Sequence, residues 1–232
     1  FNFNILILLI ASLSLSSTYL LTTFTLIIRS FGALNNLNAK SFNLSSFILM
    51  FNSFTIAISL SLIALMVDRQ SSLKLITYLF LMSTLLITFG HFFLILKFKL
   101  IIKFIQKLFK IYFKFNNFKN FDHRIKYNNI DFIGLLSWIF LLLGFIFPTY
   151  LASFFYEYRT TCFQFSFIFN SVGTILSVIY VDKKISIYGD DNLDLSKSDI
   201  IVSFLSRVLV SRFLSSLLIF INLIFFFIIF IK

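Results

Sequence analysis

Arginine side chains beside or inside long apolar segments are the residues of this chain best suited to do chemistry. Arg29 and Arg159 flank such segments, and Arg207 and Arg212 lie where the last one opens. A charge inside a membrane is costly, so it marks a binding site or pathway by default. Guanidinium also binds two phosphate oxygens at once. We predict that these arginines bind phosphate; the alternative is that each snorkels from a helix end.

The polar residues near these arginines leave their roles open. Arg207 and Arg212 are separated by about 140° around a helix, so they reach different phosphate oxygens or different helices. Asn52 and Asn170 lie in the middle of apolar segments, and Asn170 has small neighbours that permit close helix packing. We expect the two asparagines to be packing residues first and pathway residues second.

The sequence excludes several classes of site. One cysteine and two histidines cannot build a disulfide framework, a zinc site with several thiolates or a three-imidazole centre. The sequence contains neither a P-loop nor a dinucleotide-binding glycine pattern. His91 has no carboxylate at helical spacing and is predicted to be a packed, hydrogen-bonded residue. We therefore expect no catalytic residue, no metal and no cofactor.

Composition places these residues in a membrane. Of 232 residues, 59% are apolar and 12% charged, with 36 phenylalanines and one proline. This leaves too little polar surface to solvate a core. The net charge of +11 could indicate nucleic acid, but no soluble basic domain is available to bind it. We predict no nucleic-acid partner and expect anionic phospholipid instead.

Six apolar stretches are long enough to cross a bilayer as helices. They are residues 3 to 28, 46 to 67, 75 to 96, 132 to 156, 161 to 181 and 200 to 231. The predicted fold is therefore an all-α, polytopic membrane protein with three parts. These are a first three-helix half (1 to 96), a basic connector (97 to 131) and a second three-helix half (132 to 232).

The basic connector predicts both an interfacial helix and the orientation of the chain. Its lysines recur at four, four, three and four residues, at positions 99, 103, 107, 110 and 114. Such a stripe opposite an aromatic face favours the surface of an anionic membrane. Odd-numbered loops carry fourteen basic residues and the opposite face, with the C-terminal Lys232, carries four, which places both termini away from the cytoplasm. The chain starts at Phe1 without a methionine, so we expect a processed protein or a fragment.

Residues 157 to 182 resemble a known family. Arg159 and Thr160 are followed by Asn170, Ser171, Gly173 and Thr174, and the segment closes with Val181 and Asp182. This pattern is similar to the Amj family of lipid II flippases, the alternates to MurJ. Either Arg207 or Arg212 corresponds to a further family arginine. A looser match to the family upstream includes Arg29 and Asn52. The connector shows no resemblance to the family, and Lys183 stands where the family usually has proline.

The resemblance implies a function that composition alone does not. A member of this family would be a non-enzymatic flippase of the cytoplasmic membrane that moves undecaprenyl-pyrophosphate-linked peptidoglycan precursor outward. Arg29, Arg159 and either Arg207 or Arg212 would hold the pyrophosphate in a cationic cavity between the two halves. Asn52, Thr160, Asn170, Thr174 and Asp182 would line the pathway or pack beside it.

Two other classes of protein compete with this interpretation. An organelle-encoded hydrophobic subunit of a respiratory or ATP-synthase complex would have a similar AT-rich composition and would bury its arginines against partner subunits. A six-span permease of an ABC exporter would need a separate ATPase and a coupling helix. The lysine stripe and aromatic face of the connector suit lipid better than coupling.

Overall fold

The computed structural model describes residues 3–113, 131–190 and 195–230, and nearly all of them are helical. The main helices are α1 (Phe3–Leu34), α2 (Asn38–Asp68), α3 (Leu73–Leu96), α4 (Phe98–Phe113), α5 (Phe132–Phe154), α6 (Arg159–Leu176), α7 (Lys183–Asp190) and α8 (Leu195–Phe230). A 3₁₀ turn, η1 (Tyr156–Tyr158), precedes α6, and a π-helical segment, η2 (Ser177–Asp182), joins α6 to α7. Within these residues, six helices are long and apolar enough to cross a membrane. The chain is an all-α, polytopic membrane protein, as predicted.

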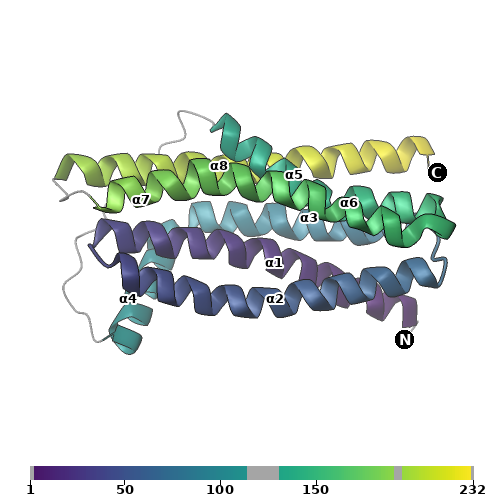
Figure 1. The fold of residues 1–232 in the computed structure, drawn as a ribbon, viewed down its shortest axis with the longest axis horizontal. Helices are drawn as coiled ribbons and strands as arrows, with labels where there is room; N and C mark the ends of the chain where they lie inside the picture. The colour runs from purple at the N-terminus through teal and green to yellow at the C-terminus, as the bar shows by residue number, and fades with distance from the viewer. Residues whose placement is uncertain (1–2, 114–130, 191–194, 231–232) are drawn as a thin grey trace.

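The long helices lie side by side along one axis (Figure 1). The α1–α2 hairpin lies on one side of the bundle and the α5–α6 hairpin on the other, while α3 and α8 pack together and close the back. The described ends of the chain lie at the same end of the bundle. Helix α4 is short and crosses the far end.

The predicted helix boundaries are close except between the first two spans, where α1 continues from the predicted end at residue 28 to Leu34 and α2 starts early. This helix begins at Asn38, eight residues before the predicted position, directly after a tight turn in which Asn36 has φ of 55°. The polar residues from Asn38 to Ser46 resemble a loop, but Ser41 and Ser45 are buried against α1. Gly32 makes this approach possible, since a Cβ there would overlap the Ser41 side chain.

Helices α1 and α2 are joined by a row of polar contacts along their length. The pairs are Ser14 with Ser59 at 2.9 Å, Thr18 with Thr55 at 2.9 Å, Thr22 with Asn52 at 3.3 Å and Arg29 with Ser45 at 3.1 Å. Hydroxyl groups that hydrogen-bond between helices are typical of helix–helix contacts within membranes, where small residues let the backbones approach closely. This row fixes which face of α1 remains for the rest of the bundle.

Replacing Thr55 with valine is expected to destabilise the hairpin modestly. The valine keeps the shape but loses the hydroxyl that meets Thr18. Interhelical hydrogen bonds in membranes contribute about 0.6 kcal/mol on average, so a Thr18→Val/Thr55→Val double-mutant cycle should give a coupling of that size. The cycle is measured by unfolding in mixed micelles. Ser53→Ala is the control, because Ser53 is exposed and, among the described residues, hydrogen-bonds only to the backbone of Leu49. An equal loss there would contradict the expectation.

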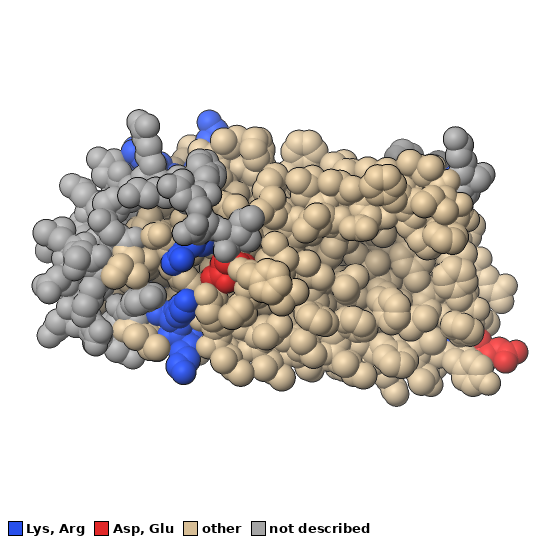
Figure 2. Space-filling view, turned by 90° about the horizontal axis from the view of Figure 1, so that it is seen from above, with Lys and Arg blue, Asp and Glu red and all other residues tan. Residues whose placement is uncertain are grey.

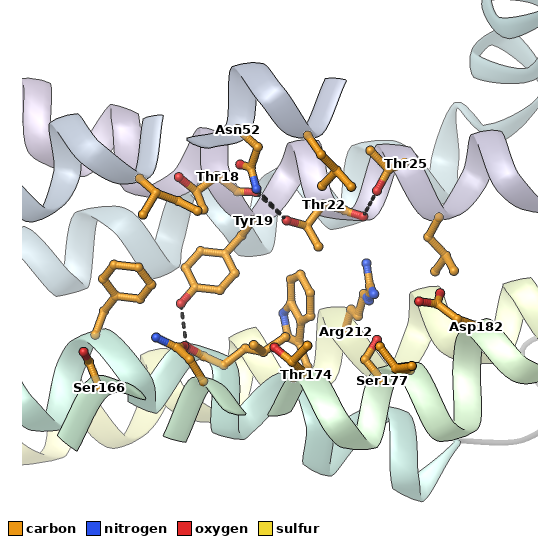
Figure 3. A pocket seen from close by; sticks show the side chains of 18 of the residues that line it. Thr18, Tyr19, Thr22, Thr25, Asn52, Ser166, Thr174, Ser177, Asp182 and Arg212 are labelled. Carbon is orange, nitrogen blue, oxygen red and sulfur yellow. Dashed lines mark hydrogen bonds between the residues drawn. The ribbon is translucent and has the colours of Figure 1, made fainter. Parts of the chain in front are cut away.

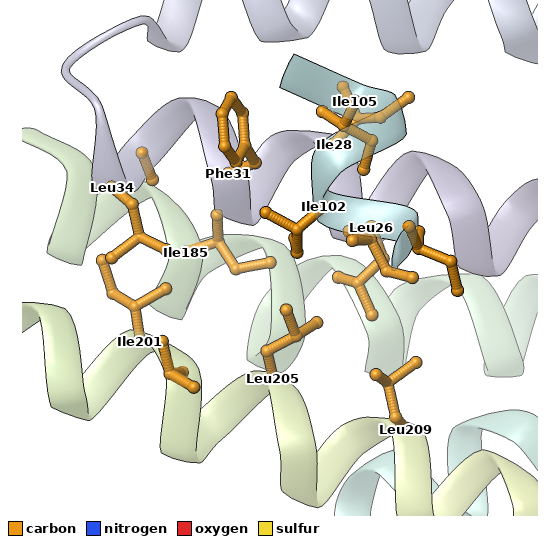
Figure 4. Packing of buried hydrophobic residues seen from close by; sticks show 14 of the residues in the cluster. Leu26, Ile28, Phe31, Leu34, Ile102, Ile105, Ile185, Ile201, Leu205 and Leu209 are labelled. Carbon is orange, nitrogen blue, oxygen red and sulfur yellow. The ribbon is translucent and has the colours of Figure 1, made fainter. Parts of the chain in front are cut away.

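Helix α4 forms as predicted, but its apolar face packs against protein. Ile102, Ile105 and Phe109 are buried against α1 and α8, in a cluster with Phe31 and Leu205 (Figure 4). Its lysines at 99, 103, 107 and 110 remain exposed, flanked by exposed Leu100 and Phe104. The sequence did not show that α1 and α8 offer a matching apolar surface. The predicted stripe residue Lys114 and the rest of the connector up to Ile130 lie outside the described residues.

Charge is concentrated at the two ends of the bundle. We call one end the basic end: it carries Arg29, Lys40, the exposed lysines of α4, Lys183 and Lys184. The opposite end carries Arg69, Lys74 and Arg159. Figure 2 shows the surface between the ends as almost free of charge on the face in view, with lysine and arginine toward the basic end. Large exposed apolar side chains such as Phe54 and Phe167 cover α2 and α6, as expected for a surface in contact with lipid.

Candidate functional site

A cavity of about 530 Å³ lies between the α1–α2 hairpin on one side and α5, α6 and η2 on the other (Figure 3). Trp138 of α5 and Arg212 of α8 also line it. Its polar lining residues are Thr18, Tyr19, Thr22, Thr25, Arg29, Asn52, Ser166, Asn170, Thr174, Ser177, Asp182 and Arg212, and the remaining lining residues are apolar. This volume is within the range of small-molecule sites in proteins.

The cavity reaches the lipid-facing surface between α2 and α6. Helix α2 packs almost entirely on α1, and α6 on α5, so that α2 and α6 make little direct contact. Leu60 of α2, Phe167 of α6 and Val178 of η2 line the cavity and are exposed on the outside of the bundle. A ligand with a long apolar tail could therefore leave the tail in lipid while its polar part enters the protein.

Helix α1 presents a narrow polar stripe to the cavity. Thr18, Thr22, Thr25 and Arg29 are spaced by four, three and four residues, which places them on one helix face. Each threonine hydroxyl donates its hydrogen bond to a backbone carbonyl of α1; for example, Thr22 donates to the carbonyl of Thr18 at 2.9 Å. Sequence reasoning missed this stripe, although its spacing is visible in an otherwise apolar segment.

Arg212 is the most deeply buried charge in the cavity lining. The residue is 5% exposed, and its Nη1 donates a hydrogen bond of 2.9 Å to Thr23 Oγ1. Its guanidinium lies 4.2 Å from the centroid of the Trp138 ring. Among the described residues, no carboxylate lies within 4.0 Å of it. An arginine held by a hydroxyl and an aromatic face retains free donors for an anion.

A second group of buried residues fixes the position of Arg212. His91 Nε2 and Thr23 Oγ1 are 2.9 Å apart, and His91 Nδ1 is 2.9 Å from the Ile87 carbonyl. His91 also meets the edge of Trp138, with ring centroids 5.4 Å apart. The prediction that His91 is packed and hydrogen-bonded is confirmed. Its packing matters for the site, because it holds both groups that contact Arg212.

Arg29 and Asp182 form an ion pair toward the basic end of the cavity. Arg29 Nη1 lies 3.3 Å from Asp182 Oδ2, and the side chains are 24% and 34% exposed. Asp182 ends the π-helical segment that begins at Ser177. Residues five apart diverge by about 140° on an α-helix, but i→i+5 bonding brings them to one face. Ser177 and Asp182 consequently both line the cavity.

Asn170 approaches α5 closely from the α6 side of the cavity. A Cβ added at Gly144 of α5 would overlap the amide group of Asn170. Gly173 of α6 likewise allows α5 to approach closely, because a Cβ there would lie 2.9 Å from the carbonyl oxygen of Ser137. Ser137 in turn donates to the carbonyl of Gly173 at 2.8 Å. The small residues after Asn170 thus bring α5 and α6 together, as their pattern indicated.

The structure brings together six of the nine residues singled out from the sequence. Arg29, Asn52, Asn170, Thr174, Asp182 and Arg212 all line the cavity. Arg159, Thr160 and Arg207 do not. Arg159 lies at the opposite end of the bundle, where its Nε contacts Asp68 at 2.8 Å and its guanidinium stacks 4.5 Å from the Tyr156 ring centroid. Thr160 follows it in the first turn of α6.

Arg207 is separated from the cavity by the rotation of α8. It lies five residues before Arg212 and is half-buried, and its Nε has no hydrogen-bond partner among the described residues. The single cationic chamber predicted from the sequence therefore contains Arg29 and Arg212 alone among the four candidate arginines. The prediction placed Arg159 in this chamber together with Arg29 and either Arg207 or Arg212. Arg29 lies near the end of the first span and Arg159 at the start of the fifth, so the two residues lie at opposite ends of the bundle.

Comparison with known proteins identifies one family. No curated protein and no solved structure matches the chain. A family model described as Amj, Alternate to MurJ, matches residues 114–227. The match covers α5 to α8 up to Phe227, and it extends into the connector, where the sequence resemblance showed nothing. The matched residues, which supply Asn170, Thr174, Asp182 and Arg212 to the cavity, are similar to the Amj family, as the sequence pattern indicated.

Proposed function

We propose that this chain is a flippase that moves a polyprenyl-pyrophosphate-linked peptidoglycan precursor, lipid II, across the cytoplasmic membrane. Similarity to the Amj family supports this assignment. The chain would act as a lipid transporter and not as an enzyme. Its basic end would face the cytoplasm, because cytoplasmic segments retain lysine and arginine.

Arg212 is the observation that carries the proposal. A buried guanidinium with no carboxylate within 4.0 Å among the described residues is costly in a membrane, so its retention favours a role in binding an anion. Pyrophosphate suits it, since the planar fork of guanidinium donates to two oxygens at once. Arg29 would provide a second positive charge closer to the basic end.

The shape of the cavity supports a lipid-linked substrate. The prenyl chain would stay in the bilayer between α2 and α6, where both helices expose apolar side chains. The threonine stripe of α1 and the amides of Asn52 and Asn170 would face the polar part of the molecule. These groups are uncharged, so they would hydrogen-bond to a sugar or phosphate without binding it tightly.

Genetic complementation combined with reconstitution tests this function. A cell depleted of its principal lipid II flippase should survive when it expresses this chain. Purified protein in liposomes should translocate lipid II, and Arg29→Gln should reduce the rate because it removes one of the two positive charges that line the cavity. Survival without detectable translocation by the purified protein, or purification only within a larger respiratory assembly or with an ATPase, would contradict the proposal.

A further inference from the structure

A second cavity lies against the first at the basic end of the bundle. Its volume is about 550 Å³, and it is formed by the start of α2, the end of η2 and α7. Asn38, Asn43 and Ser186 give it a polar lining. It shares two residues with the first cavity, Arg29 and Asp182, and these are the two partners of the ion pair. We call this second cavity the vestibule.

The ion pair therefore stands at the boundary between the vestibule and the lipid-facing cavity. Arg29 belongs to α1, and Asp182 to η2 on the other side of the bundle. Their contact of 3.3 Å bridges the two helix hairpins where the cavities adjoin. A polar molecule that passes from the vestibule to Arg212 has to separate the two side chains or pass beside them.

The two partners of the pair are held unequally. Arg29 is also fixed by its 3.1 Å hydrogen bond to Ser45 and by the Phe42 ring, whose centroid is 5.4 Å from the guanidinium. The Asp182 carboxylate has Arg29 as its only hydrogen-bond partner in the described part of the chain. It also lies at the end of a π-helical segment, a distortion often found at functional sites. Asp182 therefore has fewer short contacts to hold it in place than Arg29 has.

We propose that the Arg29–Asp182 ion pair is a gate between the vestibule and the lipid-facing cavity, and that an incoming phosphate group opens it by replacing Asp182 on Arg29. This inference rests on the proposed function for the identity of the anion. Carboxylate and phosphate compete for the same guanidinium fork. The gate then opens when an anionic head group is present and closes again when that group moves on to Arg212.

Cysteine labelling from the basic end tests the gate without any lipid substrate. In a Cys162→Ser background, Thr22→Cys places a thiol in the cavity and Ser186→Cys one in the vestibule. A membrane-impermeant maleimide should label Ser186→Cys rapidly and Thr22→Cys slowly. Adding Asp182→Asn should accelerate the labelling of Thr22→Cys by about tenfold or more, because a charge-assisted hydrogen bond is lost.

Two controls separate opening of the gate from damage to the fold. Asp182→Glu keeps the charge and should keep the slow labelling of Thr22→Cys. Asp68→Asn removes the carboxylate of the ion pair at the opposite end and should leave labelling unchanged. Equal labelling of Thr22→Cys with and without Asp182→Asn would overturn the gate, even if the protein transports lipid II. Faster labelling in a protein that does not transport lipid II would support the gate and refute the proposed function.

Discussion

Replacing Arg212 with leucine is expected to abolish most lipid II transport while stabilising the protein. The substitution removes a buried charge that has no carboxylate partner among the described residues, and well-packed apolar replacements of such groups are often neutral or stabilising. Thr23 keeps its bond to the Tyr19 carbonyl at 3.1 Å. Loss of a charged hydrogen bond to the pyrophosphate should weaken binding by about ten- to a hundredfold. Transport in liposomes and the Tm in detergent measure the two effects.

Arg207→Leu is the matched control for this experiment. It makes the same change on the same helix, five residues earlier and outside the cavity lining. Transport should fall far less than in Arg212→Leu. If both variants lose transport equally, or if Arg212→Leu transports normally, Arg212 is not the group that receives the anion.

Replacing Gly173 with alanine is expected to destabilise the packing of α6 against α5. The new Cβ would lie 2.7 Å from Leu141 Cγ and 2.9 Å from the carbonyl oxygen of Ser137. Overpacking of this kind costs about 1 to 3 kcal/mol. It should push α6 away from α5 and displace Asn170 and Thr174, so the transport rate should fall as well. Unfolding in mixed micelles measures the loss of stability.

Gly134→Ala is the same chemical change on α5, but we do not expect it to reduce stability. A Cβ at Gly134 would meet Asp131 at 3.5 Å, which is ordinary contact. Alanine is also the better helix former by up to about 1 kcal/mol. Gly134→Ala should therefore be neutral or stabilising. If Gly173→Ala proves as stable as Gly134→Ala, α5 and α6 do not depend on the close approach described here.

The helices could be predicted from the sequence because a bilayer sets the length of an apolar segment. The main error, the late start given to α2, arose where polar residues pack against another helix. Ser41 and Ser45 resemble loop residues until Gly32 and Arg29 of α1 are placed beside them. The docking of α4 was missed for a similar reason: its apolar face suits lipid as well as it suits the buried surface of α1 and α8.

The cavity could be predicted only in part. Arg29 and Asp182 were recognised as costly charges, but their pairing depends on how η2 is wound. The choice between Arg207 and Arg212 depends on the rotation of α8, which an almost wholly apolar helix does not reveal. The separation of Arg159 from Arg29 could have been predicted from the alternating topology. The first and fifth spans run in the same direction, and Arg29 lies near the end of the first whereas Arg159 lies at the start of the fifth. The threonine stripe of α1 could likewise have been predicted from the spacing of its residues.

Trp138 has a consequence for how this protein can be studied. It is the only tryptophan in the chain, and its ring lies against the Arg212 guanidinium, 4.2 Å from centroid to carbon. Indole emission responds to a cation at its face, so the native fluorescence of the protein originates beside the group proposed to receive the anion. Occupancy of that position can be followed optically in the unlabelled protein, without a dye or an engineered reporter.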